Sequence, residues 1–258
     1  MNAWHDAENY AEKAQDYFEN GRLGEAEEAI RQALELDPDR SEWLFNLGMT
    51  LEARGINDEA VLAFEQAANN AYDDSETIFA SAVSLIRLKA YISAENLFKR
   101  VIEIDPFDSS AHVELLDAYL SQRKYEELEL AYYFAIEMLN EPTSSLLMVM
   151  ADSLIAQKDW ARAEWCLENA IEKDSGFPGL RSRLASVRLA CGDFDGAIKI
   201  FKDELRINPL DIELNLQLID ALIVASKKQE ACKYLLRVIE LEPANIYAHE
   251  RLGHLYFS

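Results

Sequence analysis

Two histidines near the C-terminus come closest to a catalytic metal motif. The segment His249-Glu-Arg-Leu-Gly-His254 has a glutamate directly after its first histidine, as zinc peptidase helices do. A zinc site on one helix needs histidines four residues apart. These are five apart and so lie about 140° from each other around a helix. We therefore expect no metal site here.

Three adjacent carboxylate pairs are the next candidates for chemistry: Glu27-Glu28, Asp73-Asp74 and Glu126-Glu127. Acid and base catalysis would need both members of a pair to converge on one substrate. Neighbouring helical residues point to different faces, so we interpret these pairs as solvated surface. The sequence contains no Ser/His/Asp set and no Gly-rich phosphate loop. We expect no enzymatic activity and no cofactor.

The three cysteines, Cys166, Cys191 and Cys232, are widely spaced and form no CxxC pair. Their odd number argues against a disulfide framework, and we expect buried, reduced thiols within helices. The chain starts without a basic region followed by an apolar run, and it has no stretch of 18 apolar residues. These features predict a soluble, cytoplasmic protein without a membrane span.

A period of 34 residues organises the elements that carry these side chains. Alanines recur at this spacing, with one doubled step that contains a single inserted residue, and a large apolar residue follows each alanine by four positions. The alanines are Ala26, Ala60, Ala94, Ala163, Ala197 and Ala231, and the apolar residues are Ile30, Phe64, Phe98, Leu167, Phe201 and Leu235. Prolines at 38, 106, 209 and 243 end the blocks, because proline stops a helix. The period predicts repeated pairs of antiparallel helices.

This pattern resembles the tetratricopeptide repeat (TPR), which has W-x2-L-G-x2-Y, then A-x3-F, then P. The resemblance implies an all-α, right-handed superhelix of seven helix pairs and one C-terminal helix, forming one domain over residues 1–258. The expected repeats are 7–40, 41–74, 75–108, 109–143, 144–177, 178–211 and 212–245, with the terminal helix at 246–258. His112 and His249 fall at the fourth repeat position, where a partly buried packing residue is expected.

Repeat four departs from the pattern, because Leu128 replaces the small alanine and Tyr132 follows it. A leucine at this place should push the two helices apart or rotate them. We therefore expect an irregular joint near residues 128–143 that bends the array without dividing it into domains.

The net charge of −22 excludes most nucleic-acid and anionic-membrane partners by repulsion. The charge is concentrated in residues 1–74, which hold 18 acids and 5 bases. A partner approaching this end should therefore be basic. Co-chaperones of the TPR family grip acidic tails with a clamp of Lys, Asn and Arg. Here Asn46 matches one clamp position, but Ala11, Gln15, Glu76 and Ala80 occupy the others, so the cations that such a clamp needs are missing.

In TPR arrays the first helix of each pair lines a concave groove, and the resemblance places the partner site there. The groove residues expected from it combine apolar side chains with carboxylates. They are Glu8, Glu12, Phe18, Glu42, Phe45, Asn46, Met49, Glu52, Glu76, Phe79, Val83, Arg87, Glu114, Asp117, Met148 and Asp152. Such a groove suits a basic, amphipathic segment of another protein.

We therefore predict a non-enzymatic scaffold for protein–protein interaction. Two alternatives stay open. The terminal helix carries Tyr247, Leu252, Leu255, Tyr256 and Phe257, and could join two copies as a homodimer or self-assembling module. The chain could also be the regulatory TPR region of a longer, truncated protein.

Overall fold

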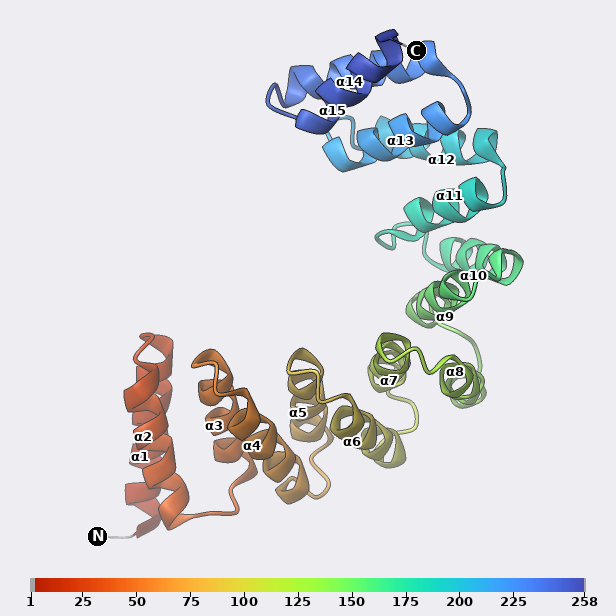
Figure 1. The fold of residues 1–258 in the computed structure, drawn as a ribbon. Helices are drawn as coiled ribbons and strands as arrows, with labels where there is room; N and C mark the ends of the chain where they lie inside the picture. The colour runs from red at the N-terminus through yellow and green to blue at the C-terminus, as the bar shows by residue number, and fades with distance from the viewer. Residues whose placement is uncertain (1–2, 258) are drawn as a thin grey trace. The chain divides into compact units, whose positions relative to one another are not determined.

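The computed structural model describes residues 3–257, and within this range the chain forms fifteen α-helices and no strand (Figure 1). The helices of the first four pairs are α1 Ala3–Glu19, α2 Leu23–Leu36, α3 Ser41–Ala53, α4 Asn57–Asn70, α5 Ser75–Arg87, α6 Tyr91–Ile104, α7 Ser109–Ser121 and α8 Tyr125–Leu139. The remaining helices are α9 Ser144–Ala156, α10 Trp160–Lys173, α11 Leu180–Ala190, α12 Phe194–Ile207, α13 Ile212–Val224, α14 Lys228–Leu241 and α15 Ile246–Phe257. This confirms the predicted all-α fold of seven pairs and a terminal helix.

The predicted repeat boundaries coincide with helix starts in most blocks, since α3, α5, α7, α9, α13 and α15 begin where a new block was expected. The first and sixth blocks are exceptions, and α1 begins at Ala3, before the expected residue 7. The first helix of the sixth block, α11, begins at Leu180, because Pro178 precedes it and Gly179 adopts a left-handed φ of 79°. Four second helices, α2, α6, α12 and α14, end as predicted at the residue before an Asp-Pro, Asn-Pro or Glu-Pro pair, as at Leu36 and Ile104.

Each turn within a helix pair contains one residue in the left-handed region. Glycine supplies it in three pairs, at Gly21, Gly55 and Gly192. In the other four pairs the same place is taken by Lys89, Arg123, Lys158 and Ser226, which have φ between 58° and 63°. A non-glycine residue there is strained by about 1 kcal/mol or more, so packing of the helices on both sides holds the turn.

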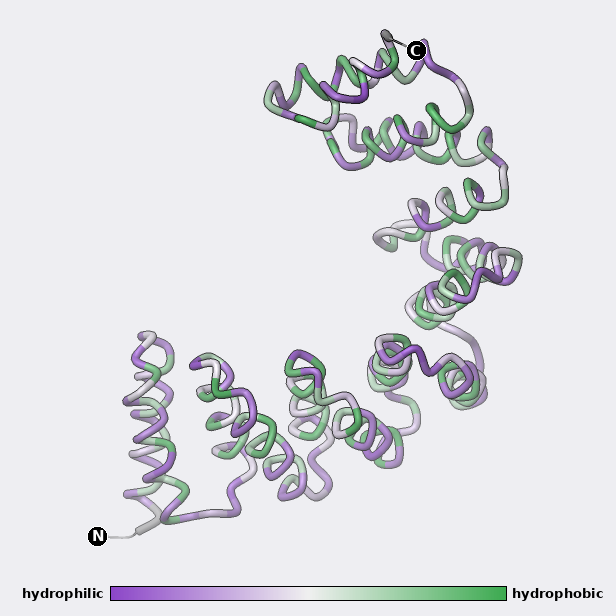
Figure 2. The backbone as a smooth tube through the Cα atoms, in the orientation of Figure 1, coloured by the Kyte–Doolittle hydropathy of each residue, from purple (hydrophilic) through white to green (hydrophobic). Residues whose placement is uncertain are grey.

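The repeat alanines make the core. All six are fully buried, as are the large apolar residues four positions later (Figure 2 shows the hydropathy along each helix). A small side chain at this point lets the paired helices approach closely, as the period predicted. Gly48 in α3 marks a tighter approach still, because a Cβ added there would lie 2.7 Å from the ring of Phe64.

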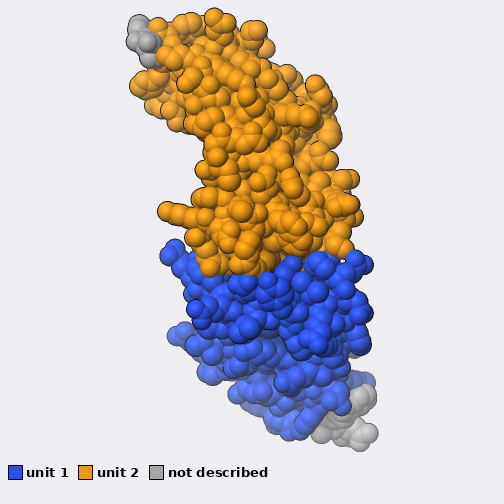
Figure 3. Space-filling model, turned by 90° about the vertical axis from the view of Figure 1, so that its right-hand side faces the viewer, with its two compact units in different colours: residues 1–142 blue, residues 143–258 orange. Residues whose placement is uncertain are grey.

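The chain divides into two compact units, residues 1–142 (unit 1) and 143–258 (unit 2) (Figure 3). The division follows α8, the second helix of the irregular repeat four. Leu128 is fully buried in α8, and Tyr132 is buried one turn later. The single domain over residues 1–258 stays a prediction.

Three sequence expectations about side chains were wrong. Of the cysteines, Cys166 is buried, but Cys191 is exposed and lies just beyond the end of α11, and Cys232 is half-buried. Glu27 was interpreted as solvated surface, but its side chain is only 15% exposed and contacts two arginines. His249 was expected to be partly buried and is exposed, whereas His112 is buried.

Only part of the terminal helix α15 is exposed and so accessible to a second copy of the chain. Leu252 and Leu255 pack against a buried cluster formed by Ile219, Leu235, Val238 and Ala248. Ile246 and Tyr256 are exposed, and the side chain of Phe257 lies outside the described residues. Leu255 therefore belongs to the core of unit 2, and self-association through this helix stays a prediction.

Candidate functional site

In unit 1, two adjoining hollows open between α1 and α3. The first has an apolar wall and a volume of about 170 Å³. Its lining residues are Ala14, Gln15, Phe18, Ile30, Phe45, Asn46, Met49 and Thr50. Phe45 is fixed from behind by Phe64, with ring centroids 5.4 Å apart, and the Thr50 hydroxyl donates to the Asn46 carbonyl over 2.8 Å. The hollow therefore has a rigid apolar wall and an amide-bearing rim.

The second hollow, of about 500 Å³, is lined mainly by polar groups. Its lining residues are Glu8, Ala11, Glu12, Gln15, Asp16, Arg40, Glu42, Trp43 and Asn46. Gln15 and Asn46 are common to both hollows, so a ligand that fills one reaches the other. Four carboxylates face a single arginine, and that guanidinium stacks over the Trp43 ring at 5.5 Å. This hollow favours a cation.

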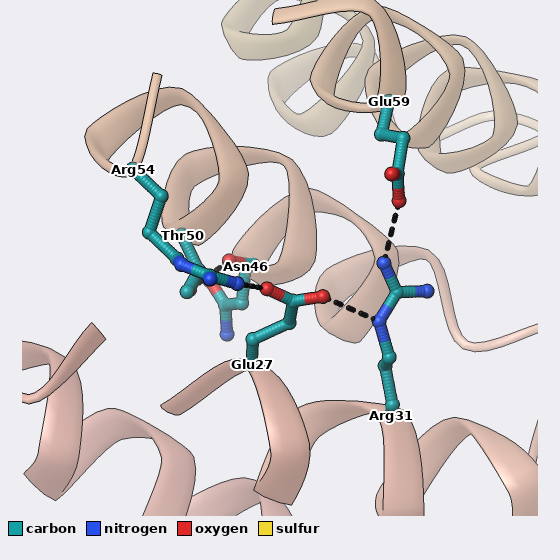
Figure 4. Close-up of polar contacts among 6 residues, drawn as sticks. All are labelled: Glu27, Arg31, Asn46, Thr50, Arg54 and Glu59. Atoms are coloured by element: carbon teal, nitrogen blue, oxygen red, sulfur yellow. Dashed lines mark hydrogen bonds and ion pairs between the residues drawn. The ribbon is translucent and has the colours of Figure 1, made fainter. Parts of the chain in front are cut away.

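Arg31 and Arg54, in repeats one and two, pair with glutamates (Figure 4). Arg31 donates to Glu27 over 2.8 Å and to Glu59 of the next repeat over 2.7 Å. Arg54 contacts the other oxygen of Glu27. These pairs link α2 to the end of α3 and to α4, and they neutralise the charges of Arg31 and Arg54. Among the described residues no ion pair involves Glu8, Glu12 or Glu42, so their charge is directed to solvent.

Glu52 and Arg87 do not act as separate groove charges. The Arg87 guanidinium binds the Glu52 carboxylate through two hydrogen bonds of 2.9 and 2.8 Å, joining α3 to α5. Hydrogen bonding to Glu52 raises the pKa of Arg87. The same guanidinium lies 3.7 Å from the Met49 sulfur and 3.0 Å from the Ser84 hydroxyl. The pair lies beside Met49, which lines the apolar hollow, and adds no net charge.

Further along unit 1, the predicted residues are less accessible. Phe79 is half-buried and packs edge-on against Phe98 at 5.7 Å, and Val83 is half-buried. Glu76 is exposed at the start of α5. Glu114 and Asp117 on α7 are half-buried, and burial raises the pKa of Glu114.

In unit 2, the predicted residues Met148 and Asp152 lie on α9 and are half-buried. The Asp152 carboxylate accepts a hydrogen bond of 2.7 Å from Arg183 on α11, so this acid is neutralised within the unit. A further hollow of about 530 Å³ lies between the loop at residues 175–179 and the ends of α12 and α13. Both signs of charge line it, including Arg181 and Glu204 at 3.6 Å.

The predicted site lacks several lining residues, among them Ala11, Ala14, Asp16, Ile30, Arg40, Trp43 and Thr50. Arg40 closes repeat one and Trp43 is the third residue of repeat two, so both sit where two repeats meet. A search restricted to the usual groove positions of each first helix passes over them.

The two histidines at the fourth repeat position, His112 and His249, contact backbone carbonyl oxygens. His112 Nε2 donates to the Pro106 carbonyl oxygen over 2.9 Å, and His249 makes the same contact with Pro243. No group of three or more His, Cys, Asp or Glu suited to hold a metal occurs within residues 3–257. No helix in the described part of the chain is long and apolar enough to cross a membrane.

Family comparison agrees with the repeat geometry. Profiles of the tetratricopeptide repeat match residues 11–76 and 154–216, which together are half of the chain. The chain belongs to the tetratricopeptide repeat family. Membership in this family indicates a scaffold for protein–protein interaction. No curated protein matches the chain in sequence.

Solved structures show the same fold at low sequence identity. A TPR protein from Parabacteroides merdae is 16% identical, with a TM-score of 0.64, and the alignment covers 98% of this chain and 99% of that one. YrrB, a TPR protein with an unusual peptide-binding site, is 16% identical at a TM-score of 0.56, covering 73% and 97%. A thermophilic TPR protein of Thermus thermophilus is 22% identical at a TM-score of 0.53, covering 71% and 99%.

Proposed function

We propose that this protein is a non-enzymatic scaffold that binds a basic, amphipathic segment of another protein between α1 and α3. The observation that carries the proposal is the pair of adjoining hollows, one apolar and one lined by carboxylates, that share Gln15 and Asn46. An apolar residue and a nearby lysine or arginine of one segment can occupy both at once.

Size and charge support this assignment. The apolar hollow is comparable to a cavity of about 150 Å³ that binds benzene, so it holds one large apolar side chain. Among the described residues Glu8, Glu12 and Glu42 form no ion pair, whereas Arg31 and Arg54 pair with Glu27 and Glu59. Peptide binding by the structural relative YrrB is a precedent within the fold.

The test compares charge reversals inside and outside the hollow. The probe is a synthetic peptide with leucines on one face and lysines beside them, and binding is followed by stopped-flow fluorescence at several salt concentrations. Glu12→Lys with Glu42→Lys should slow association and flatten its salt dependence, because rim charges steer encounter. Glu28→Lys with Glu103→Lys is the matched control, since both glutamates are exposed on the second helices of their pairs.

The apolar wall is tested separately. Phe45→Ala should accelerate dissociation and weaken binding by about 2 kcal/mol if Phe45 is a central anchor. Circular dichroism of the variant checks that loss of the Phe64 contact leaves the helices folded. Loss of binding in the Glu28 and Glu103 control, with binding kept in the Glu12 and Glu42 variant, would show that the partner uses another face.

A further inference from the structure

The outer surface of α8 differs from that of every other second helix in the array. Leu130, Tyr133 and Phe134 are 72%, 55% and 45% exposed. They are spaced i, i+3, i+4, so they form one apolar stripe on the helix. Phe134 also lies against the buried His112 ring, with centroids 5.9 Å apart. We call Leu130, Tyr133 and Phe134 the α8 stripe.

The other repeats are internal controls for these positions, which lie two, five and six residues after the repeat alanine or its replacement, Leu128. The equivalent triplets are Glu28, Arg31 and Gln32; Leu62, Glu65 and Gln66; Asn96, Lys99 and Arg100; Trp165, Glu168 and Asn169; Lys199, Lys202 and Asp203; and Lys233, Leu236 and Arg237. Each contains at most one large apolar residue. The fold therefore does not require apolar side chains here, and only repeat four places three together.

Polar residues at these positions normally connect neighbouring repeats. Arg31 reaches Glu59 at 2.7 Å, and Arg100 donates to the Ala68 carbonyl over 2.7 Å. The α8 stripe contains no side chain able to form such an ion pair. Exposed apolar groups gathered in this way mark an interaction surface more often than a structural need.

The charge around the stripe identifies the partner's chemistry. Residues 125–139 contain four glutamates, at 126, 127, 129 and 137, and no lysine or arginine. Glu126, Glu127 and Glu137 are exposed. A second copy of this chain would bring carboxylates against carboxylates at a net charge of −22 per chain. We infer that the α8 stripe is a second docking surface, for an amphipathic helix whose apolar face is flanked by lysine or arginine.

This surface is independent of the hollows between α1 and α3, and hydrogen exchange separates the two. The probes are a helical peptide with a leucine stripe flanked by lysines and its twin with glutamates in place of the lysines. The lysine peptide should slow amide exchange within residues 125–139, and the glutamate twin should not. Slowing confined to α1 and α3 would overturn the α8 surface and leave the proposed groove intact.

The decisive variant gives α8 two of the polar residues that α6 carries at the positions of the α8 stripe. Leu130→Asn with Tyr133→Lys introduces the residues that α6 carries at the same positions, so the helix should stay folded. We expect the α8 component of binding to weaken by about tenfold or more. Leu62→Asn, an exposed leucine at the same repeat position on α4, is the matched control and should leave binding unchanged.

A second variant keeps the α8 stripe and reverses the charge of two glutamates beside it. Glu126→Lys with Glu137→Lys should switch the preference of α8 from the lysine peptide to the glutamate peptide. Equal binding of both peptides to the unmodified chain would overturn the charge assignment. A concentration-dependent dimer in sedimentation, abolished by Leu130→Asn with Tyr133→Lys, would show that a second copy covers the stripe and would also overturn it.

Discussion

Gly48 gives the sharpest test of how repeats one and two pack. Replacing it with alanine would place the new Cβ 2.7, 2.8 and 2.9 Å from three carbons of the Phe64 ring. That ring is fully buried and is held by Phe45, so it cannot swing away. Gly→Ala inside a helix stabilises by about 0.5–1 kcal/mol, whereas overpacking a core costs about 1–3 kcal/mol. We expect Gly48→Ala to destabilise repeat two by about 1–2 kcal/mol.

Gly253 is the matched control, because it occupies the same repeat position on α15 and a Cβ there would meet no atom within 4 Å. Gly253→Ala should therefore stabilise its helix by about 0.5–1 kcal/mol. Hydrogen exchange of α3–α4 and of α14–α15 reports each effect locally, since stability in repeat arrays is local. Equal stabilisation by both substitutions would refute the packing argument. Adding Phe64→Leu to Gly48→Ala should restore part of the lost stability, because the effects of two substitutions in contact are not additive.

Two further predictions concern buried positions. Ala94→Leu should lower the free energy of unfolding by about 1–3 kcal/mol, because Ala94 is fully buried between paired helices. Ala244→Leu, at an exposed site, should change it little. Urea unfolding of both variants tests the repeat register, and equal effects would contradict it. Burial raises the pKa of the Cys166 thiol to about 11, so at pH 8 iodoacetamide should label exposed Cys191 and spare Cys166, as mass spectrometry can establish; equal labelling would contradict the burial of Cys166.

The fold was predictable from the sequence because the same packing requirement recurs in nearly every repeat. A small residue at one position and a large apolar residue four later recur in nearly every block, and the observed helices follow that register. Single turns were harder to predict. Cys191 was assigned to a helix, although α11 ends one residue earlier, because the glycine at 192 sets the turn.

The repeat pattern predicted which helices carry the candidate site, but not which of its charged residues form ion pairs with each other. Glu52 and Arg87 are 35 residues apart, so they were treated as separate groove charges, yet one repeat plus one residue brings them side by side. Asp152 and Arg183 pair in the same way across 31 residues. Contacts between adjacent repeats depend on how far each helix rotates against the next, which the pattern within a single repeat does not specify. Which groove carboxylates form ion pairs therefore depends on contacts between repeats that only the structure shows.

The ion pairs that join one repeat to the next have a consequence for cooperativity. Arg31–Glu59 and Arg87–Glu52 link repeats one, two and three, and Lys202–Glu230 links repeats six and seven. In a linear array, each repeat has its own stability and a coupling energy to its neighbours, and only the coupling makes them unfold together. Because these links are ionic and partly exposed, salt weakens the coupling more than it weakens the apolar core of each repeat. Higher ionic strength should therefore reduce how strongly neighbouring repeats unfold together.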